Sequence, residues 1–268
     1  MKRLRDKGVS RGKFFIGTSG WSYNHWRGLF YPADIPPRQW FAHYTDYISS
    51  VEINYTFYRL PTEKTFTHWR EREPAHFVYA LKAPRTITHL KKLRQPEELL
   101  HRFLDRARLL GSKLGPILYQ LPPNWHCNVE RLAEFLSLLP DDLQHVIEFR
   151  HQSWLCDESF SLLREKGVGF CIVSLPDFPC PYVITGPMVY IIMHGVDVKY
   201  GDRYDEEQLD DWARRVVTFL EEGRDTFVYF NNDAQAYAVE NAWELQSMVE
   251  ELKRRSDAQR SYAVSEIG

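Results

Sequence analysis

The sequence predicts a single α/β domain folded as a (β/α)8 TIM barrel. Short apolar runs alternate with segments in which apolar residues recur at helical spacing. Strict alternation of strand and helix favours a parallel sheet covered by helices. The 268 residues are close to the roughly 250 of a typical closed barrel, and a hydrophobic content of 44% is ample for one large core.

Eight apolar runs are expected to form the strands, because they are short and contain β-branched or aromatic residues. In chain order they are KFFIGTS (13–19), SSVEIN (49–54), HFVYALK (76–82), PILYQL (116–121), HVIEFR (145–150), VGFCIVS (168–174), MVYIIMH (188–194) and TFVYFNN (226–232).

Seven segments between and after these runs are expected to be helical. They are PPRQWFAHYTDYI (36–48), PTEKTFTHWRER (61–72), QPEELLHRFLDRARLLG (95–111), NVERLAEFLSLLP (128–140), DESFSLLREKG (157–167), YDEEQLDDWARRVVTFLEEG (204–223) and NAWELQSMVEELKRR (241–255). Thr62 and Asp205 are suitable N-caps, and Gly111, Gly167 and Gly223 are suitable C-terminal stops.

The sixth connection breaks the alternation. Its prolines, in LPDFPCPYVITGP (175–187), exclude a regular helix and predict an irregular loop. The expected organisation is therefore a basic N-terminal tail (1–12), one barrel domain (13–255) and a polar C-terminal tail (256–268). A doubly wound open sheet is the alternative fold, but the glycines of GTSGWSYNHW (17–26) lack the GxGxxG spacing typical of such sheets.

The overall charge excludes a whole-protein attraction to nucleic acid or to an anionic membrane, because the formal net charge is −2. The N-terminal thirteen residues and the stretch from Lys82 to Arg108 are locally basic. We interpret them as a solvated tail and a helix surface in preference to a phosphate-binding patch.

The cysteines and the N-terminus predict a cytoplasmic protein with no membrane partner. Cys127, Cys156, Cys171 and Cys180 are irregularly spaced, without a CxxC pair, which is typical of thiols in a reducing compartment. The sequence has neither the apolar core of a signal peptide nor an apolar stretch of about 18 residues that could span a membrane. Protein partners are not indicated.

Polar side chains gather at the C-terminal ends of the expected strands. Alternate side chains of a barrel strand point inward, so with Val51 and Ile53 facing the helices, Glu52 faces the barrel interior. The same argument selects Asn54, Lys82, Gln120, Glu148, Arg150, His194, Asn231 and Asn232. Because burying these groups together is costly without a role, and because TIM barrels carry their sites at this end, a functional pocket is favoured over a structural polar plug.

These residues permit several chemistries. Glu52 and Glu148 are candidates for a general acid and base, with Lys82 and Arg150 lowering the pKa of the nearer carboxylate. His194 is a candidate proton carrier, and Lys82 and Arg150 are candidate ligands for phosphate or carboxylate. Lys82 could instead form a Schiff base in a desolvated pocket. If the substrate were a glycoside, the separation of the two glutamates would decide between inversion and retention.

A metal site is not predicted, and no cofactor is expected. Glu52, Glu148 and His194 could in principle hold a divalent cation. However, there is no HxH or HExxH motif, and Lys82 and Arg150 would offset the carboxylates and repel a cation.

Aromatic residues are frequent in the loops that follow the strands. Trp21, Tyr23 and Trp26 follow the first strand, Tyr58 follows the second, and Trp154 follows the fifth. They either pack these loops onto the barrel or form a stacking platform for a sugar face or a nucleobase, and both interpretations remain open. His89, after the third strand, is also a candidate to reach the rim.

Several long motifs resemble the YecE-like family, also called the domain of unknown function 72 family. They are IGTSGWSYNHWRGLFYP (16–32), VEINYTFYRLP (51–61), LKAPRTITH (81–89), YQLPP (119–123), EFRHQSW (148–154), HG (194–195) and YFNN (229–232) followed by NA (241–242). The resemblance extends from about Phe14 to about Leu252 and implies a TIM barrel. It implies no settled activity or substrate.

Two positions depart from the family pattern. An arginine commonly precedes and another often follows the His-Gly pair in the family, where this chain has Met193 and Val196. If those arginines bind an anion, this chain uses a different or weaker anion site.

The leading functional hypothesis is a hydrolase or lyase that acts on a phosphorylated sugar, nucleotide or nucleic-acid fragment at the C-terminal rim. Its ligand would be a small-molecule or oligonucleotide-like anion. The first alternative is a non-catalytic ligand-binding or regulatory barrel, which would bind without turnover. The second is a glycoside-type hydrolase that uses Glu52 and Glu148 and recognises no phosphate.

Overall fold

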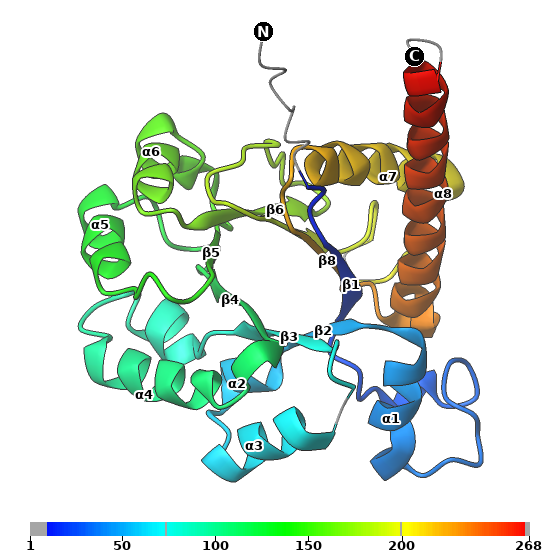
Figure 1. Ribbon diagram of the computed structural model, residues 1–268. Helices are drawn as coiled ribbons and strands as arrows, with labels where there is room; N and C mark the ends of the chain where they lie inside the picture. The colour runs from blue at the N-terminus through cyan, green and yellow to red at the C-terminus, as the bar shows by residue number, and fades with distance from the viewer. Residues whose placement is uncertain (1–9, 73, 199, 266–268) are drawn as a thin grey trace, which may run out of the picture.

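The computed structural model describes residues 10–72, 74–198 and 200–265 (Figure 1). Within them, the expected strands form a closed parallel barrel in the order β1 to β8. The strands are β1 Phe14–Ser19, β2 Ser50–Ile53, β3 Val78–Lys82, β4 Leu114–Gln120, β5 His145–Glu148, β6 Gly169–Ser174, β7 Val189–Met193 and β8 Thr226–Phe230. The predicted (β/α)8 fold is confirmed.

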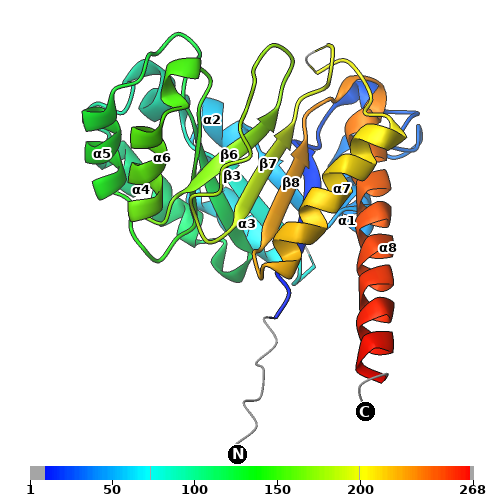
Figure 2. The same cartoon turned by 90° about the horizontal axis from the view of Figure 1, so that it is seen from above.

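The helices lie around the barrel (Figures 1 and 2). The long ones are α1 Pro37–Tyr47, α3 Glu63–Arg72, α4 Glu97–Arg108, α5 Val129–Ser137, α6 Asp157–Glu165, α7 Glu206–Glu221 and α8 Tyr237–Ser265. The connection between β6 and β7 contains no helix, as its prolines predict. In the described part of the chain, no helix is long and apolar enough to cross a membrane.

Two elements differ from the expectation. Tyr55–Tyr58, expected as a loop, forms the short helix α2 directly after β2. Helix α8 continues to Ser265, so residues 256–265 of the expected C-terminal tail are helical. Figure 2 shows that the end of α8 extends past the barrel, away from the strand arrowheads. Residues 1–9 of the expected N-terminal tail lie outside the described residues.

Apolar side chains form two separate cores, one on each side of the sheet. Val51, Ile53 and Ile147 belong to the large core between the barrel and its helices. The smaller core fills the barrel interior and contains Ala80, Leu118, Val146, Cys171, Val173, Met188, Tyr190, Ile192, Phe227 and Tyr229. The two cores are separate because successive side chains of each strand point alternately into the barrel and out toward the helices. At Gly17 a Cβ would lie 2.0 Å from the Ser50 carbonyl oxygen, so β1 can approach β2 this closely only with glycine.

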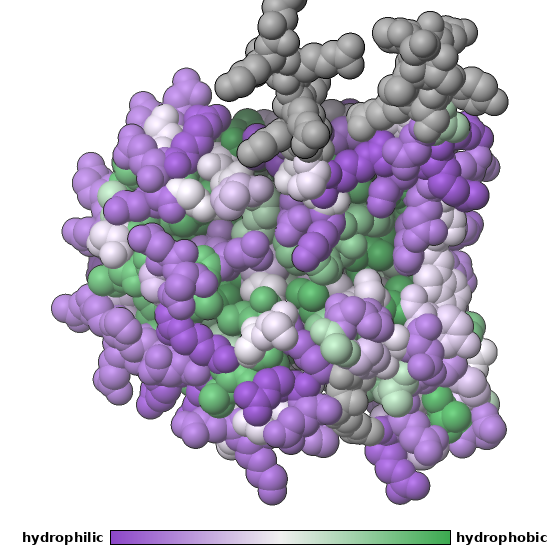
Figure 3. All heavy atoms as spheres, in the orientation of Figure 1, coloured by the Kyte–Doolittle hydropathy of each residue, from purple (hydrophilic) through white to green (hydrophobic). Residues whose placement is uncertain are grey.

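The molecular surface is mostly hydrophilic at its periphery. Figure 3 shows polar residues around the edge of one face and apolar residues mainly toward its middle. The arrangement agrees with amphipathic helices that turn their apolar sides to the sheet. Figure 2 shows the strand arrows of β6, β7 and β8 pointing toward one end of the barrel, and this end carries the candidate site.

The N-terminus of α7 is stabilised by a reciprocal cap. Asp205 accepts a hydrogen bond from the Gln208 amide at 2.9 Å, and the Gln208 side chain accepts one from the Asp205 amide at 3.0 Å. We expect Asp205→Ala to lower the free energy of unfolding by about 1 kcal/mol, because the amide loses its acceptor. Urea unfolding measures this, with Asp205→Asn as the control that retains a capping oxygen. Equal stability of the alanine variant and the parent would contradict the prediction.

Candidate functional site

Seven inward side chains converge at the C-terminal ends of the strands and form what we call the rim cluster. Its members are Glu52, Lys82, Gln120, Glu148, Arg150, His194 and Asn231. Glu52, Glu148 and His194 are fully buried, and Lys82 is 6% exposed. The predicted convergence of these residues is therefore present in the structure.

Glu148 is the centre of one half of the cluster. Its Oε2 accepts a hydrogen bond from Nε2 of Gln120 at 2.9 Å, and its Oε1 accepts one from Nε of Arg150. Burial alone raises the pKa of a carboxyl group, but here the Arg150 guanidinium, together with the Lys82 ammonium, outweighs it and holds the pKa of Glu148 well below its usual range. Glu148 is therefore an ionised acceptor at neutral pH.

The partners of His194 define its protonation state. Nη2 of Arg150 lies 2.7 Å from Nε2 of His194, and a guanidinium can only donate, so Nε2 accepts. Its 3.8 Å separation from Glu148 is too long for a hydrogen bond. The ring proton is then on Nδ1, which lies 3.2 Å from Nδ2 of Asn231. Because the two ends of an amide are assigned from their hydrogen bonds, we assign the flipped orientation, in which the Asn231 oxygen accepts this proton. Burial, aided by Arg150, lowers the pKa of His194 to about 4, which agrees with a neutral imidazole.

Gly195 allows the chain to turn immediately after His194. Its φ of +108° favours glycine, and a Cβ there would lie 2.3 Å from Oδ1 of Asp202. The Gly195 amide donates to the Tyr204 hydroxyl at 3.1 Å, which anchors the turn.

Glu52 is the centre of the other half. Oε1 accepts a hydrogen bond from the Ser19 hydroxyl at 2.9 Å, and Oε2 accepts one from the Tyr190 hydroxyl at 2.7 Å. Nζ of Lys82 lies 3.6 Å from Oε1. Lys82 also lowers the pKa of Glu148, so its ammonium is close enough to influence both carboxylates.

Other residues surround the cluster. Lys82 lies 5.9 Å from the centre of the Phe57 ring, and His89 packs edge-on against the same ring at 5.0 Å. Partial burial, with Lys82 and Arg85, lowers the pKa of His89 to about 4. The Asn54 amide nitrogen donates to the Ser19 carbonyl at 3.0 Å and joins the ends of β1 and β2. His89 and Asn54 thus lie at the rim, as expected.

Asn232 does not belong to the cluster, which corrects the sequence-based assignment. Successive residues of an extended strand point to opposite faces, so Asn231 and Asn232 cannot both face inward. Asn232 is fully buried on the outer side, where its amide nitrogen donates to the Asp202 carbonyl at 2.9 Å and to the Asn241 side chain at 3.0 Å. It joins the end of β8 to α8.

The aromatic residues divide between packing and the rim. Trp26 and Trp154 are fully buried, and their indole nitrogens donate to the carbonyls of Asp233 and Trp125. Both therefore pack loops onto the barrel and are not ligand platforms.

Of the remaining rings, Trp21 packs on α1, at 4.4 Å between its ring centre and that of Phe41. The pKa of Tyr23 is raised by burial and by the carboxylates of Asp233 and Glu52, so this ring lies near the cluster. Tyr58 is 70% exposed and makes an edge contact with Phe57.

Several residues at the site were missed by sequence reasoning. Tyr190 was detectable, because it shares the phase of Ile192 and His194 along β7. Ser19 ends β1 and was overlooked as a small residue. Tyr200, whose ring packs 5.4 Å from that of His194, follows an irregular turn that no strand period places.

The two departures from the family pattern lie away from the interior. Met193 is fully buried in the outer core, and Val196 packs against that same core. Neither side chain belongs to the rim cluster. In the parts of the chain that the structure describes, no three His, Cys, Asp or Glu side chains are grouped as metal ligands.

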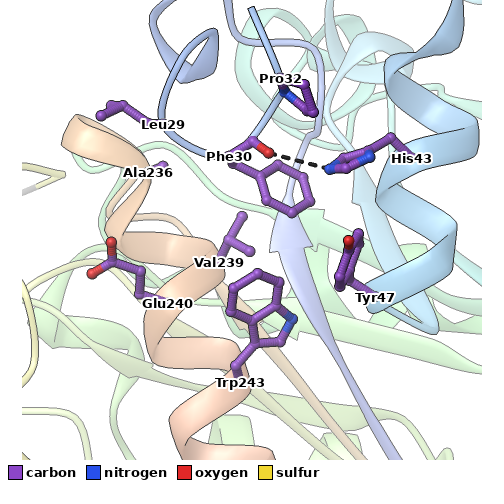
Figure 4. A pocket seen from close by; sticks show the side chains of 9 residues that line it. All are labelled: Leu29, Phe30, Pro32, His43, Tyr47, Ala236, Val239, Glu240 and Trp243. Atoms are coloured by element: carbon purple, nitrogen blue, oxygen red, sulfur yellow. Dashed lines mark hydrogen bonds between the residues drawn. The ribbon is translucent and has the colours of Figure 1, made fainter. Parts of the chain in front are cut away.

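A separate pocket lies outside the barrel between α1, α8 and the loop after β1 (Figure 4). It has a volume of about 260 Å³ and is lined mainly by apolar and aromatic side chains, including Phe30, Tyr47 and Trp243. Nε2 of His43 hydrogen-bonds the Phe30 carbonyl at 3.2 Å across it. No member of the rim cluster contributes to this pocket.

Comparison with known proteins places these observations in a family. The family model described as "Protein of unknown function DUF72" matches residues 15–263. The chain is 21% identical to UPF0759 protein YunF of Bacillus subtilis over 88% of this chain and 94% of that protein. It is 29% identical to UPF0759 protein YecE of Escherichia coli over 60% of this chain and 58% of that protein.

Solved structures of DUF72 family proteins have the same fold as this chain. A DUF72 family protein from Thermotoga maritima superposes with a TM-score of 0.79 at 28% identity, over 89% of this chain and 99% of that one. A DUF72 family protein from Enterococcus faecalis superposes with a TM-score of 0.75 at 20% identity, over 88% and 95% of the two chains.

Proposed function

The chain belongs to the DUF72 family of proteins of unknown function, and from its own rim cluster we propose that it is a hydrolase or lyase of a phosphorylated ligand. The ligand is a phosphorylated sugar, a nucleotide or a nucleic-acid fragment, bound at the C-terminal end of the barrel. TIM-barrel enzymes carry their active sites at this end.

The observation that supports the proposal is that the cations of the rim cluster lie nearer to solvent than its carboxylates. The carboxylates of Glu52 and Glu148 are fully buried, whereas the side chains of Lys82 and Arg150 retain 8% and 7% exposure. A ligand entering from solvent therefore meets the cations before the carboxylates, which favours an anion. Nη1 of Arg150 has no hydrogen-bond partner among the described residues and is available to a phosphate oxygen.

The buried groups then supply the acid–base chemistry. Glu148 is held ionised and orients the Arg150 guanidinium, so it acts as a positioning group and not as the acid. Glu52 is the acid–base candidate beside Lys82. Tyr190 keeps its proton, because burial raises its pKa well above the usual value, and it can donate that hydrogen bond to Glu52 throughout. Neutral His194 becomes a base when a ligand draws Arg150 away from Nε2.

A glycoside-type hydrolase is less well supported. Its substrate is a neutral sugar, whereas Lys82 and Arg150 lie nearer to solvent than the two glutamates and favour an anionic ligand. The non-catalytic alternative has one observation in its favour, because the ionisable members of the cluster already pair with one another. It predicts saturable binding without turnover.

The proposal is tested by calorimetric titration with inorganic phosphate and by mass-spectrometric detection of cleavage products from a panel of sugar phosphates, nucleotides and short oligonucleotides. We expect Lys82→Met to weaken phosphate binding by about 30-fold or more, since removing a buried charge from the site costs at least about 2 kcal/mol. Lys113→Met is the matched control, because Lys113 is also 6% exposed but donates to the Arg70 carbonyl before β4 begins. Equal binding by the parent and Lys82→Met would refute the anion site, and binding without cleavage of any compound of the panel would favour the non-catalytic barrel.

A further inference from the structure

A second positively charged region, which we call the basic hollow, lies beside the rim. It has a volume of about 460 Å³ and is lined by Leu90, Lys91, Lys92, Arg94, Gln95, Trp125, Asn128 and Arg131. Residues 90–95 belong to the connection after β3, and residues 125–131 belong to the connection after β4 and the start of α5. Because both connections leave the C-terminal ends of adjacent strands, the hollow opens at the same end of the barrel as the rim cluster.

Its charge is uncompensated. Four side chains of the lining are cationic, Lys91, Lys92, Arg94 and Arg131, and none is acidic. Within the described ranges none of the four forms an ion pair, and Nζ of Lys91 donates to the Gln95 carbonyl at 3.0 Å. In a chain of net charge −2, gathering four unpaired cations in one concavity raises the local concentration of anions.

The backbone that carries these cations is held in place. Lys92, Leu93 and Gln95 have φ values of +47°, +63° and +42°, a conformation that non-glycine residues rarely adopt. Leu93 is 3% exposed and its amide donates to the Ile87 carbonyl at 2.9 Å, which anchors the turn to the core. Part of the basic stretch from Lys82 to Arg108, interpreted from sequence as a solvated surface, is therefore a shaped concavity.

An aromatic ring completes the hollow. Trp125 is half-buried and packs edge-on against Trp154, with 5.1 Å between ring centres. Trp125 and Arg131 both line the concavity. Cations around an aromatic face are the combination with which proteins bind single-stranded nucleic acid, because phosphates meet the charges and a base stacks on the ring.

Contacts through His89 connect the lining of the hollow to the rim cluster. Leu90 of the hollow directly follows His89, whose ring contacts Phe57, and Phe57 in turn lies beneath Lys82. Lys82 and Arg150 both lower the pKa of His89, so its imidazole lies within the field of the rim cations. The cations of the rim and those of the hollow are thus separated by the Phe57 ring and a neutral His89, and no acidic side chain belongs to this series of contacts.

We propose that the rim and the basic hollow together bind a short single-stranded nucleic acid. One phosphate lies at Lys82 and Arg150, the following phosphates occupy the hollow, and a base stacks on Trp125. This inference rests on the anion site of the proposed function and specifies the ligand class as an oligonucleotide instead of a mononucleotide or a sugar phosphate.

The test measures binding of fluorescein-labelled hexathymidylate by anisotropy and of thymidine monophosphate by calorimetry. The hexamer binds at least about tenfold more tightly than the monophosphate. Lys92→Ala/Arg131→Ala weakens hexamer binding about tenfold and leaves monophosphate binding unchanged. The slope of log K against the logarithm of the salt concentration becomes shallower by about 1.4, because each of the two phosphates that the variant no longer neutralises contributes about 0.7. The matched control is Arg164→Ala/Lys166→Ala, which removes two exposed cations where α6 ends.

Each outcome distinguishes the two proposals. If Lys92→Ala/Arg131→Ala binds the hexamer as the parent and the control do, the basic hollow is not a binding site, while the rim proposal stands. If Lys82→Met binds both probes as the parent does, the rim site fails and the combined ligand fails with it. If a six-unit inorganic polyphosphate competes as strongly as the hexamer, stacking makes no contribution and the nucleic-acid class is wrong.

Discussion

The free energy of unfolding is expected to fall by about 6 kcal/mol between pH 7 and pH 4 through two histidines alone. Burial lowers the pKa of His145 and of His194 from 6.5 to about 4 in the folded protein. Each pKa unit is worth about 1.36 kcal/mol, so each histidine contributes about 3 kcal/mol.

The sign follows from the protons bound in each state. Between pH 6.5 and 4 the unfolded chain protonates both imidazoles and the folded protein does not, so the unfolded state binds more protons and stability rises with pH. The stabilisation is complete above pH 6.5 and is lost as the pH falls toward 4. Glu148 contributes to the pH dependence at more acidic pH. Because its pKa is lowered in the folded protein, its stabilisation is complete above the ordinary carboxyl pKa of 4.5 and is lost as the pH falls below that value.

Urea unfolding at half-unit steps of pH measures the effect. His194→Gln and His145→Gln remove one titrating ring each, and each variant should flatten the profile between pH 4 and 6.5. His25→Gln is the control, since the His25 ring is 48% exposed. Parallel profiles for the parent and both buried-site variants would show that these histidines are not neutral in the folded protein.

Replacing Arg150 with methionine is expected to lower the free energy of unfolding by about 3–5 kcal/mol at pH 7. The change leaves Glu148 fully buried without its guanidinium partner, and breaking a buried ion pair from one side costs about this much. His194 also loses the donor to its Nε2.

The double variant Glu148→Gln/Arg150→Met separates charge from packing. Because it removes both charges, it should regain at least half of the stability that Arg150→Met loses. The midpoints of urea unfolding provide the comparison. A double variant whose destabilisation equals the sum of the two single variants would show that the pair contributes through packing and not through its charge.

Much of the architecture was determined by the sequence itself. Apolar runs with a two-residue period placed the strands, and the same period directed Glu52, Lys82, Glu148 and His194 inward. The same period allows only one of the neighbours Asn231 and Asn232 to face inward, so the prediction that both line the site was wrong for Asn232. The proline-rich sixth connection was also predicted, because proline removes a helical hydrogen-bond donor whatever its surroundings are.

The pairing of the polar groups was decided only by the tertiary structure. Tyr190 donates to Glu52 across 138 residues of sequence, and Arg150 donates to His194 across 44. Local patterns also could not show that Trp26 and Trp154 are buried, or that Lys92 and Arg131 line the same concavity. Local sequence specifies which face of a strand a residue occupies, but closure of the barrel brings distant strand ends together, and protonation and ligand preference depend on those neighbours.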